Sequence, residues 1–313
     1  MDWGDRIGRR LKPRDLHVFM AVVEHGNMAK AAEHLAISRP VVSKTITDLE
    51  HTLGVPLFDR TPQGVEPTAY GRALSARSTA VFDELRQSVK EIEFLADPSS
   101  GELRIGCTET LTAGLVSTVI EQLSRNHPKL IFQMATADVA TLHFRFLRER
   151  KCELIVSRAL PGPGEPDMNA EPLFNEESIV VVGPGSKWLR RRRVALADLD
   201  EASWILSSLE FVPGAPLFEA FTGLRFPRAV IYSNSLSLRT KLLADGRFVT
   251  LVPGSVLRFG SRQFQFKPLP VKVPRSPLPV VITTLKNRTL SPMAQLFIEH
   301  IRRLAKPLAK IKS

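Results

Sequence analysis

Arg39, Ser43 and Thr47 recur at four-residue intervals, and Lys44 stands beside the second of them. In a helix this spacing places the four side chains on one face. Arginine and lysine donate hydrogen bonds to O6 and N7 of guanine, and serine and threonine hydroxyls contact bases or phosphates. These residue types therefore suit contacts in the major groove of double-stranded DNA.

Two short helices are needed to position these side chains. Asn27 is a suitable N-cap for a first helix that would bury two alanines. Ser38 is expected to cap a second helix, and Pro40 fits its first turn because the missing N–H would be unpaired there. The buried residues of the second helix would be Val42, Ile46, Leu49 and Leu53. This arrangement describes a helix-turn-helix, although other amphipathic helix pairs with a polar outer face share the pattern.

Three further elements are expected to flank the pair. An upstream helix with apolar residues at helical spacing should end at Gly26. The segment TPQG at residues 61–64 favours a tight turn and predicts a small hairpin, or wing, with Arg60 placed to contact a phosphate. Thr68 can cap a long helix that continues to about residue 96.

An apolar stripe on this long helix indicates dimerisation. Its members recur at intervals of seven, four and seven residues and are Leu74, Val81, Leu85 and Ile92. A narrow stripe of this kind is typical of a coiled-coil seam between two chains. The alternative is a helix that docks on its own domain.

The first 95 or so residues resemble the N-terminal region of LysR-type transcriptional regulators at the family's spacing. The residues that carry the resemblance are Leu16, Phe19, Val22, Gly26, Ala31, Ala32, Leu35, Ile37, Ser38, Val42, Ser43, Ile46, Leu49, Glu50, Leu53, Gly54, Leu57, Phe58, Arg60, Thr61, Gly64, Thr68 and Gly71. Arg39 stands where many members carry glutamine, and Pro67 stands where leucine is usual. The first departure would change the preferred base, and the second casts little doubt on the match.

The resemblance implies a multidomain α+β architecture. A winged helix-turn-helix would span residues 14–71, with its recognition motif at about 31–50, and a linker and dimerisation helix would span 72–96. An effector domain with the fold of type 2 periplasmic binding proteins would span 101–307. Its first lobe would hold about 101–160 and 275–307, and its second about 170–272.

The expected DNA-binding residues follow from the polar pattern and the resemblance. They are Asn27, Ser38, Arg39, Pro40, Ser43, Lys44, Thr47, Arg60 and Thr61. A homodimer or homotetramer would place two recognition helices in successive major grooves of a promoter site. An effector that binds one conformation better would change DNA bending and contact with RNA polymerase, a further expected partner.

The C-terminal two thirds of the chain alternate strand and helix patterns, which indicates α/β sheets. A polar break at residues 97–101 precedes the first strand, and a Pro- and Gly-rich break at 160–167 separates two sets of elements. Two lobes of this kind suggest a cleft that binds a small molecule at the carboxyl ends of the strands.

Polar residues follow several of these strands. The expected effector-binding residues are Thr108, Glu109, Thr110, Ser157, Arg158, Ser207, Asn234 and Ser235. Thr110, Ser207 and Ser235 would equally serve as ordinary helix caps. Arg158 is the most informative, because a guanidinium pairs with a carboxylate through two parallel hydrogen bonds. We therefore expect a small anionic effector, such as a carboxylic or sugar acid.

The net charge of +11 does not by itself indicate DNA binding. Residues 1–100 hold 13 Lys and Arg against 14 Asp and Glu, whereas residues 101–313 hold 30 against 18. Part of the excess lies in RRRR at 190–193 and in the C-terminal tail, which could be a solvated face and a frayed end. DNA binding is therefore predicted from the helix-turn-helix motif and not from the net charge.

Composition excludes several other classes of protein. No apolar run reaches the roughly 18 to 20 residues of a membrane span, and the N-terminus lacks a signal peptide, so we expect a cytoplasmic bacterial protein that associates with the nucleoid through DNA. Two cysteines, Cys107 and Cys152, cannot form a disulfide framework or a cysteine-rich metal site, and we expect inert thiols, no metal and no cofactor.

Rival functions are less consistent with the sequence. An enzyme would need a nucleophile beside a base, yet four of the seven histidines lie before residue 52, and the GxSxG and GxGxxG motifs are missing. A solute-binding protein would need an export signal. A DNA-binding protein without an effector would not explain more than 200 residues of α/β sheet.

Overall fold

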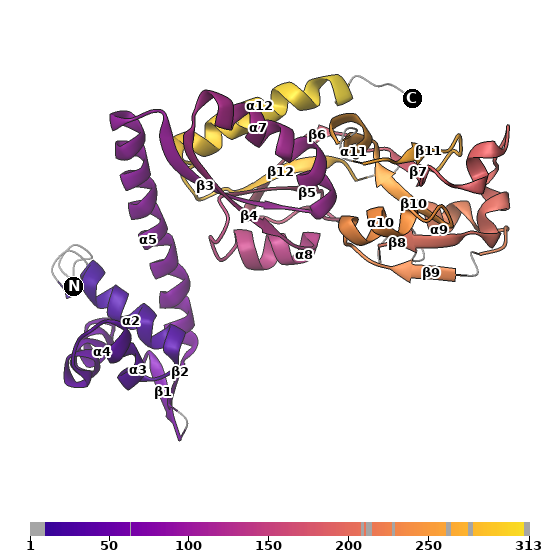
Figure 1. The fold of residues 1–313 in the computed structure, drawn as a ribbon. Helices are drawn as coiled ribbons and strands as arrows, with labels where there is room; N and C mark the ends of the chain where they lie inside the picture. Colours follow the sequence, from indigo (N-terminus) through magenta and orange to yellow (C-terminus); the bar gives the residue numbers. More distant parts are fainter. Residues whose placement is uncertain are drawn as a thin grey trace. The chain divides into compact units, whose positions relative to one another are not determined.

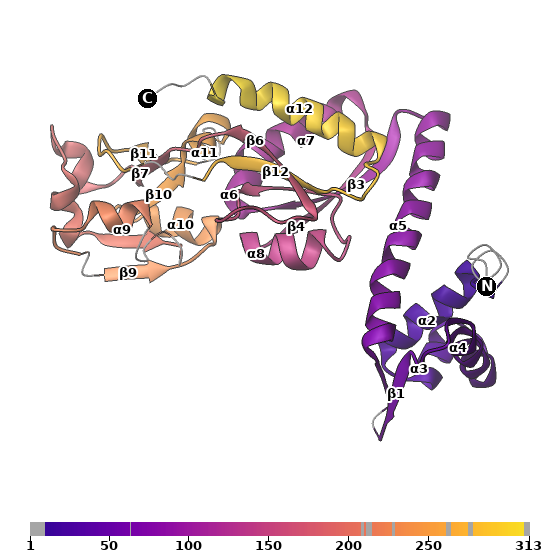
Figure 2. The same ribbon diagram turned by 180° about the vertical axis from the view of Figure 1, so that it is seen from behind.

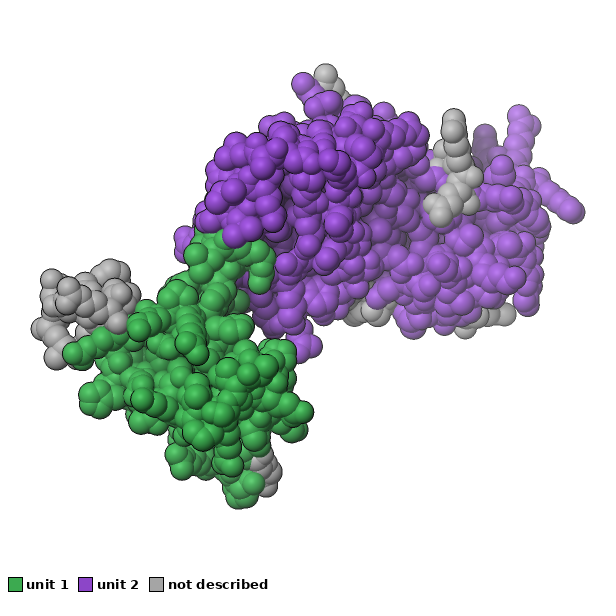
Figure 3. Space-filling model, turned by 60° about the vertical axis from the view of Figure 1, so that its left-hand side comes forward, with its two compact units in different colours: residues 1–86 green, residues 87–313 purple. Residues whose placement is uncertain are grey.

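The computed structural model describes residues 10–62, 64–207, 210, 215–226, 229–260, 264–274 and 278–309. The chain divides into two compact units, residues 1–86 and 87–313, which Figure 3 shows in different colours. Each unit has its own hydrophobic core, and each is described by itself.

The first unit contains a three-helix cluster, a hairpin and most of a long helix (Figure 1). Its elements are α2 (Pro13–His25), α3 (Met28–His34), α4 (Arg39–Leu53), β1 (Phe58–Thr61), β2 (Gly64–Pro67) and α5 (Ala69–Ala96). Gly26 and Gly54 end α2 and α4 in the left-handed conformation, with φ of 59° and 73°. The expected helix-turn-helix and hairpin are therefore confirmed, and β1 pairs with β2 in antiparallel register from Phe58↔Pro67 to Thr61↔Gly64.

The core of this unit lies between α2, α3 and α4. Phe19, Val22, Ala31, Val42 and Leu49 are at most 1% exposed. The small side chain of Ala31 lets α3 approach its neighbours closely, as the alanine pattern predicts. This packing fixes the direction of α4 and thus determines which of its residues face outward.

The predicted helix caps are only partly confirmed. The side chain of Asn27 accepts hydrogen bonds from the backbone N–H groups of Ala29 and Lys30, and Thr68 Oγ1 accepts one from Gly71. Ser38 occupies the N-cap position of α4, but its side chain makes no capping hydrogen bond. Its backbone carbonyl accepts from Val41 and Val42 instead, so the helix start does not depend on the hydroxyl.

The described residues of the second unit form two five-stranded sheets. The first has the order β4-β3-β5-β12-β6, with β3 (Ser100–Cys107), β4 (Lys129–Thr136), β5 (Leu154–Arg158), β6 (Met168–Phe174) and β12 (Val280–Leu285). Strand β3 runs parallel to β4 and β5, whereas β12 runs antiparallel to β5 and β6. The chain thus returns to the first sheet after completing the second, as expected for two lobes.

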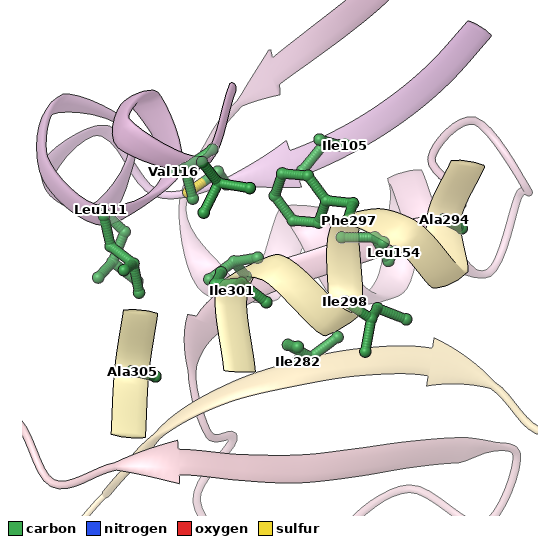
Figure 4. Close-up of a cluster of buried hydrophobic side chains, with 14 of the residues drawn as sticks. Ile105, Leu111, Val116, Leu154, Ile282, Ala294, Phe297, Ile298, Ile301 and Ala305 are labelled. Atoms are coloured by element: carbon green, nitrogen blue, oxygen red, sulfur yellow. The ribbon is translucent and has the colours of Figure 1, made fainter. Parts of the chain in front are cut away.

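Helices cover both faces of the first sheet (Figures 1 and 2). They are α6 (Glu109–Leu111), η1 (Thr112–Val116), α7 (Ser117–Asn126), α8 (Val139–Thr141), η2 (Leu142–Leu147) and α12 (Pro292–Ala309). Phe297 and Ile301 of α12 lie in one buried cluster with Ile105 and Ile282 of the sheet, as Figure 4 shows. The helix expected at 112–126 begins earlier, at Glu109, and contains a π-helical turn, η1.

The second sheet has the order β11-β7-β10-β8-β9. Its strands are β7 (Ser178–Val182), β8 (Ser203–Leu206), β9 (Ala229–Tyr232), β10 (Phe248–Pro253) and β11 (Lys267–Pro268), and its helices are η3 (Lys187–Arg190), η4 (Leu196–Glu201), α9 (Pro216–Ala220), α10 (Leu236–Leu243) and α11 (Gly254–Phe259). Trp204 and Phe221 are fully buried in its core, and the Trp204 indole N–H donates to the carbonyl of Leu199.

Strand β6 was not predicted from the sequence. We expected the second lobe to begin at about residue 170, but β6 pairs with β12, so the chain leaves the first sheet only after Phe174. The strand was missed because its segment, MNAEPLF, contains a proline and lacks a regular apolar alternation.

Candidate functional site

Helix α4 has one apolar face and one polar face. Val42, Ile46 and Leu49 are buried against the rest of the first unit, with exposures of 0%, 2% and 1%. On the outward face Arg39, Lys44 and Thr47 are exposed and Ser43 is half-buried. The structure therefore brings together the four polar residues that the sequence placed on one face.

Other predicted DNA-binding residues lie near the start of α4. Ser38 and Pro40 are exposed, whereas the carboxamide oxygen of Asn27 is used to cap α3. Val41 was not predicted, although it is 41% exposed in the first turn of α4. An exposed apolar side chain at this place has the chemistry to contact a thymine methyl group. The polar pattern that guided the sequence analysis gave no reason to select it.

The hairpin is fixed to the helices by backbone contacts. The N–H of Val65 donates to the carbonyl of Gly26 over 2.9 Å. Gly64 has a φ of 148°, and a Cβ atom there would collide with the same carbonyl, so glycine is required. Arg60 is exposed on β1 and Thr61 is half-buried. The hairpin therefore holds Arg60 on a structured strand.

Glu50 joins α4 to the segment that precedes the hairpin. Its carboxylate accepts hydrogen bonds from the backbone N–H groups of Leu57 and Phe58, at 2.7 and 3.3 Å. Glu50 is part of the family pattern in the sequence, but that pattern predicts no role for it. Its position at the end of α4 makes it a link between the recognition helix and the hairpin.

The predicted dimerisation residues of α5 fall into two groups. Val81, Leu85 and Ile92 are 44%, 50% and 67% exposed, whereas Leu74 packs against the core of the first unit. Leu74 therefore contributes to its own domain, and its assignment to an exposed stripe was wrong. Val89 and Leu95 extend the exposed row, at 54% and 75%.

The predicted effector residues of the first sheet lie together at the carboxyl ends of β3 and β5. Cys107 of β3 pairs with Val156 of the parallel strand β5, so Thr108–Thr110, which follow β3, lie near Ser157 and Arg158, the last two residues of β5. Ser157 is fully buried, and its hydroxyl donates to the carbonyl of Arg158. This hydroxyl faces the interior, so Ser157 lacks the access that a ligand contact requires.

The second sheet brings its polar residues to a comparable edge. Strands β8 and β9 are parallel neighbours, and Ser207 and Asn234–Ser235 follow their ends. Ser235 caps α10 by accepting a hydrogen bond from Leu238, and Asn234 is exposed. The N–H of Ser207 donates to the carboxylate of Glu210 over 2.6 Å.

A hydrogen bond connects the two sets of strand ends. Glu109 Oε1 accepts from the backbone N–H of Leu236, the first residue of α10, over 2.6 Å. A carboxylate at a helix N-terminus is stabilised by the helix dipole. Glu109 and Ser235, both predicted from the sequence, are thereby brought to the same place from different lobes.

Four charged residues lie near this junction: Arg158, which the sequence predicts, and Glu176, Glu210 and Arg239, which it does not. Arg239 of α10 is 2% exposed, and its guanidinium donates to the carbonyls of Ser233 and Leu251 and to the carboxylate of Glu210. Glu176 is 3% exposed and accepts hydrogen bonds from the backbone N–H and hydroxyl of Ser255. Sequence patterns gave no signal for these residues, because buried charges do not follow the hydrophobic period.

Arg158 is the fourth charged residue. Among the described residues its guanidinium makes one hydrogen bond, to the carbonyl of Leu278 over 3.4 Å. Burial lowers the pKa of Arg158, and the charges of Glu176 and Glu210 oppose this effect. Burial also raises the pKa of Glu176, against the hydrogen bonds from Ser255. Arg158 is thus a half-buried cation, and within the described residues its guanidinium has further hydrogen-bonding capacity.

The two cysteines have different surroundings but similar chemistry. Cys107 and Cys152 are both buried and unbridged. Burial raises the pKa of the Cys107 thiol to about 12 and that of Cys152 to about 11. A thiol of this kind is a poor nucleophile at neutral pH, as the sequence analysis expected.

Within the described residues, no group of three or more His, Cys, Asp or Glu side chains is placed to hold a metal ion. In the same part of the chain, no helix has both the length and the apolar character to cross a membrane.

Comparison with known proteins agrees with this arrangement. Residues 13–72 match the model of the bacterial regulatory helix-turn-helix protein, lysR family, and residues 96–306 match the LysR substrate binding domain. The HTH-type transcriptional regulator GbpR of Azospirillum brasilense is 31% identical over 296 residues, which cover 94% of this chain and 86% of that protein. The SDS degradation transcriptional activation protein of Pseudomonas sp. (strain ATCC 19151) is 31% identical over 78% of this chain and 79% of that protein.

Solved structures show the same fold. Full-length CbnR in complex with its target DNA has a TM-score of 0.62 at 22% identity, covering 94% of this chain and 99% of that one. ArgP from Mycobacterium tuberculosis has a TM-score of 0.67 at 18% identity, covering 95% and 98%. With a helix-turn-helix, a two-lobed effector domain and family models that match both parts, the chain belongs to the LysR family of DNA-binding transcriptional regulators, which respond to small-molecule effectors and are not enzymes.

Proposed function

We propose that α4 enters the major groove and that Arg39, Ser43, Lys44 and Thr47 contact base edges there. The observation that carries this proposal is the division of α4 into a buried apolar face and an exposed polar face. Arg60 on the hairpin would contact a phosphate, which fixes the register of the protein on DNA without specifying sequence. The proposed contacts to the DNA backbone also include Asn27, Ser38, Pro40 and Thr61.

The protein acts, in this proposal, as a homodimer or homotetramer joined through α5. The exposed row of Val81, Leu85, Val89, Ile92 and Leu95 supports it, because an apolar stripe on a helix gains stability when a second helix covers it. Two chains related by a two-fold axis would place two copies of α4 in successive major grooves. The same assembly would present promoter DNA to RNA polymerase.

The effector is proposed to be a small anion that binds near Arg158. The support is the partial burial of this side chain, which lowers the pKa of Arg158, together with its single guanidinium hydrogen bond among the described residues. Thr108 and Thr110, at the strand ends of the first sheet, would supply neutral hydrogen bonds, and Ser207, Asn234 and Ser235 would do so from the second sheet. An effector that binds one arrangement of the lobes more tightly would shift the population toward it.

A thermal-shift experiment tests the effector proposal. The full-length protein is melted with a panel of carboxylates, sugar acids, aromatic acids and neutral sugars. A ligand present at about 100 times its Kd stabilises the fold by about 2.7 kcal/mol. We expect a hit among the acids that Arg158→Ala abolishes, while the exposed control Arg145→Ala keeps it. A hit that survives in Arg158→Ala but is lost in Thr110→Ala would contradict the anion site.

A further inference from the structure

Residues 187–193 form the most concentrated group of positive charge in the sequence. Five of the seven are basic, and Lys187, Arg190, Arg191, Arg192 and Arg193 are all exposed. They lie on η3 and the turn that follows it, directly after β7 of the second sheet. We call these five residues the basic turn.

A buried tryptophan holds the basic turn in place. Trp188 is 2% exposed and belongs to the core of the second sheet. Lys187 Nζ lies 4.9 Å and Arg191 Cζ 4.8 Å from the centre of an indole ring of Trp188, within the range of cation–π attraction. Backbone hydrogen bonds from Leu189 to Ser186 and from Arg191 to Trp188 close the turn. The five basic side chains are therefore attached to a folded turn and not to a frayed segment.

The basic turn is poor in compensating carboxylates. In the described part of the chain, Arg191 is its one member with a carboxylate within 4.0 Å, at 3.7 Å from Asp198. Exposed arginines elsewhere are paired more closely: Arg148 lies 2.6 Å from Glu165, and Arg302 lies 2.6 Å from Glu171. Like charges this close repel one another, so an external anion would stabilise them.

The distribution of charge between the two units points to the partner. Residues 1–86, which include the recognition helix, hold 12 Lys and Arg against 11 Asp and Glu, so residues 87–313 hold 31 against 21. A DNA-binding protein gains its sequence-independent affinity from cations that replace condensed counterions. The unit that contains α4 has almost no net charge for this purpose.

We propose that the basic turn binds the phosphate backbone of DNA, apart from the base pairs that α4 contacts. Guanidinium groups match phosphate oxygens through paired hydrogen bonds. An acidic protein is a less suitable partner, because protein interfaces bury an apolar centre and Leu189, 39% exposed, is the one exposed apolar residue of segment 187–193. This contact goes beyond the proposed function of α4, and it adds affinity for DNA of any sequence.

The test measures salt dependence in the full-length protein. Binding to a random-sequence duplex of about 30 base pairs is followed by fluorescence anisotropy from about 50 to 300 mM salt. The slope of log K against log salt reports the number of phosphate contacts, because each contact contributes about 0.9 to its magnitude. The variant R190Q/R192Q/R193Q should lower the magnitude of the slope by about 2 to 3. The variant R190K/R192K/R193K should keep it, since the charge is retained.

A matched control separates a local contact from net charge. The variant R145Q/R303Q/K306Q removes the same charge from three exposed positions in the first lobe and should leave the slope within about 0.5 of the original value. Melting curves establish that all variants are folded. An unchanged slope in R190Q/R192Q/R193Q, or an equal fall in the control, would overturn the proposal. Loss of sequence discrimination by α4 is measured separately, so failure of one proposal does not imply failure of the other.

Discussion

Arginine is used in two opposite ways in the two units. On α4, Arg39 is exposed and has no carboxylate within ion-pair distance among the described residues. On α10, Arg239 is 2% exposed and donates to two backbone carbonyls and to Glu210. The hydrogen-bonding capacity of Arg39 is therefore available to a partner, whereas that of Arg239 is already used inside the protein.

Because Arg39 is exposed and Arg239 is buried, the two arginines should affect different properties: DNA binding and the stability of the fold. An exposed arginine contributes little to folding, because water satisfies it equally well in the unfolded chain. A buried arginine leaves uncompensated groups behind when it is removed. We therefore expect substitutions on α4 to change DNA affinity and substitutions around α10 to change the free energy of unfolding.

The largest effect is expected for Arg239→Ala. The substitution leaves Glu210 without its ion pair and removes the guanidinium donor from the carbonyls of Ser233 and Leu251, and it should cost about 3 kcal/mol of stability. Chemical denaturation of the full-length protein measures it. Arg247→Ala, in an exposed pair with Asp245, is the control and should leave the free energy of unfolding almost unchanged. Equal values for the two variants would remove the contrast between buried and exposed arginines.

A smaller and selective effect is expected for Arg39→Ala. The loss should be about 1 to 3 kcal/mol on a duplex selected for tight binding and close to zero on a scrambled duplex. The comparison is made by titration at one salt concentration, after selection of a binding sequence from a random pool. Equal losses on both duplexes would rule out Arg39 as a residue that specifies sequence.

The buried carboxyl of Glu176 should make stability depend on pH. Its pKa in the folded protein is raised by burial, so the folded state holds this proton more tightly than the unfolded chain does. The contribution of Glu176 to stability is therefore present at low pH and decreases as pH rises from the ordinary value of 4.5 through the folded-state pKa. Denaturation across this range should show a decrease that Glu176→Gln reduces. The same decrease in both proteins would assign it to other groups.

The smallest effect is expected for Arg60→Ala on the hairpin. A single phosphate contact should lower the salt slope by about one and weaken binding to all sequences alike. The anisotropy titrations described for the basic turn provide the measurement. If the loss differs between the selected and scrambled duplexes, Arg60 contacts a base, and the assignment of the hairpin to backbone contacts is wrong.

The sequence predicts the first unit better than the second for a physical reason. Gly26 and Gly54 end α2 and α4, Thr68 caps α5, and all three helices have apolar periods. Each of these signals is local in the chain. Leu74 was assigned wrongly because the pattern cannot distinguish a residue that packs on its own domain from one that faces a second chain.

The effector region depends on contacts between distant segments. Glu109 and Leu236 are 127 residues apart, and the hydrogen bond between them follows from the meeting of two sheets. The polar residues at strand ends could be predicted from the order of elements, but the burial of Arg239 and Glu176 could not. Whether a charged side chain is buried depends on three-dimensional packing, which no periodicity encodes.

The most direct test measures both properties on the same two variants. Arg39→Ala and Arg239→Ala are compared for free energy of unfolding and for discrimination between selected and scrambled duplexes, at a temperature where both are folded. We predict that Arg39→Ala loses discrimination at unchanged stability and that Arg239→Ala loses stability at unchanged discrimination. Loss of stability in Arg39→Ala, or loss of discrimination in Arg239→Ala at full stability, would contradict this account of the two units.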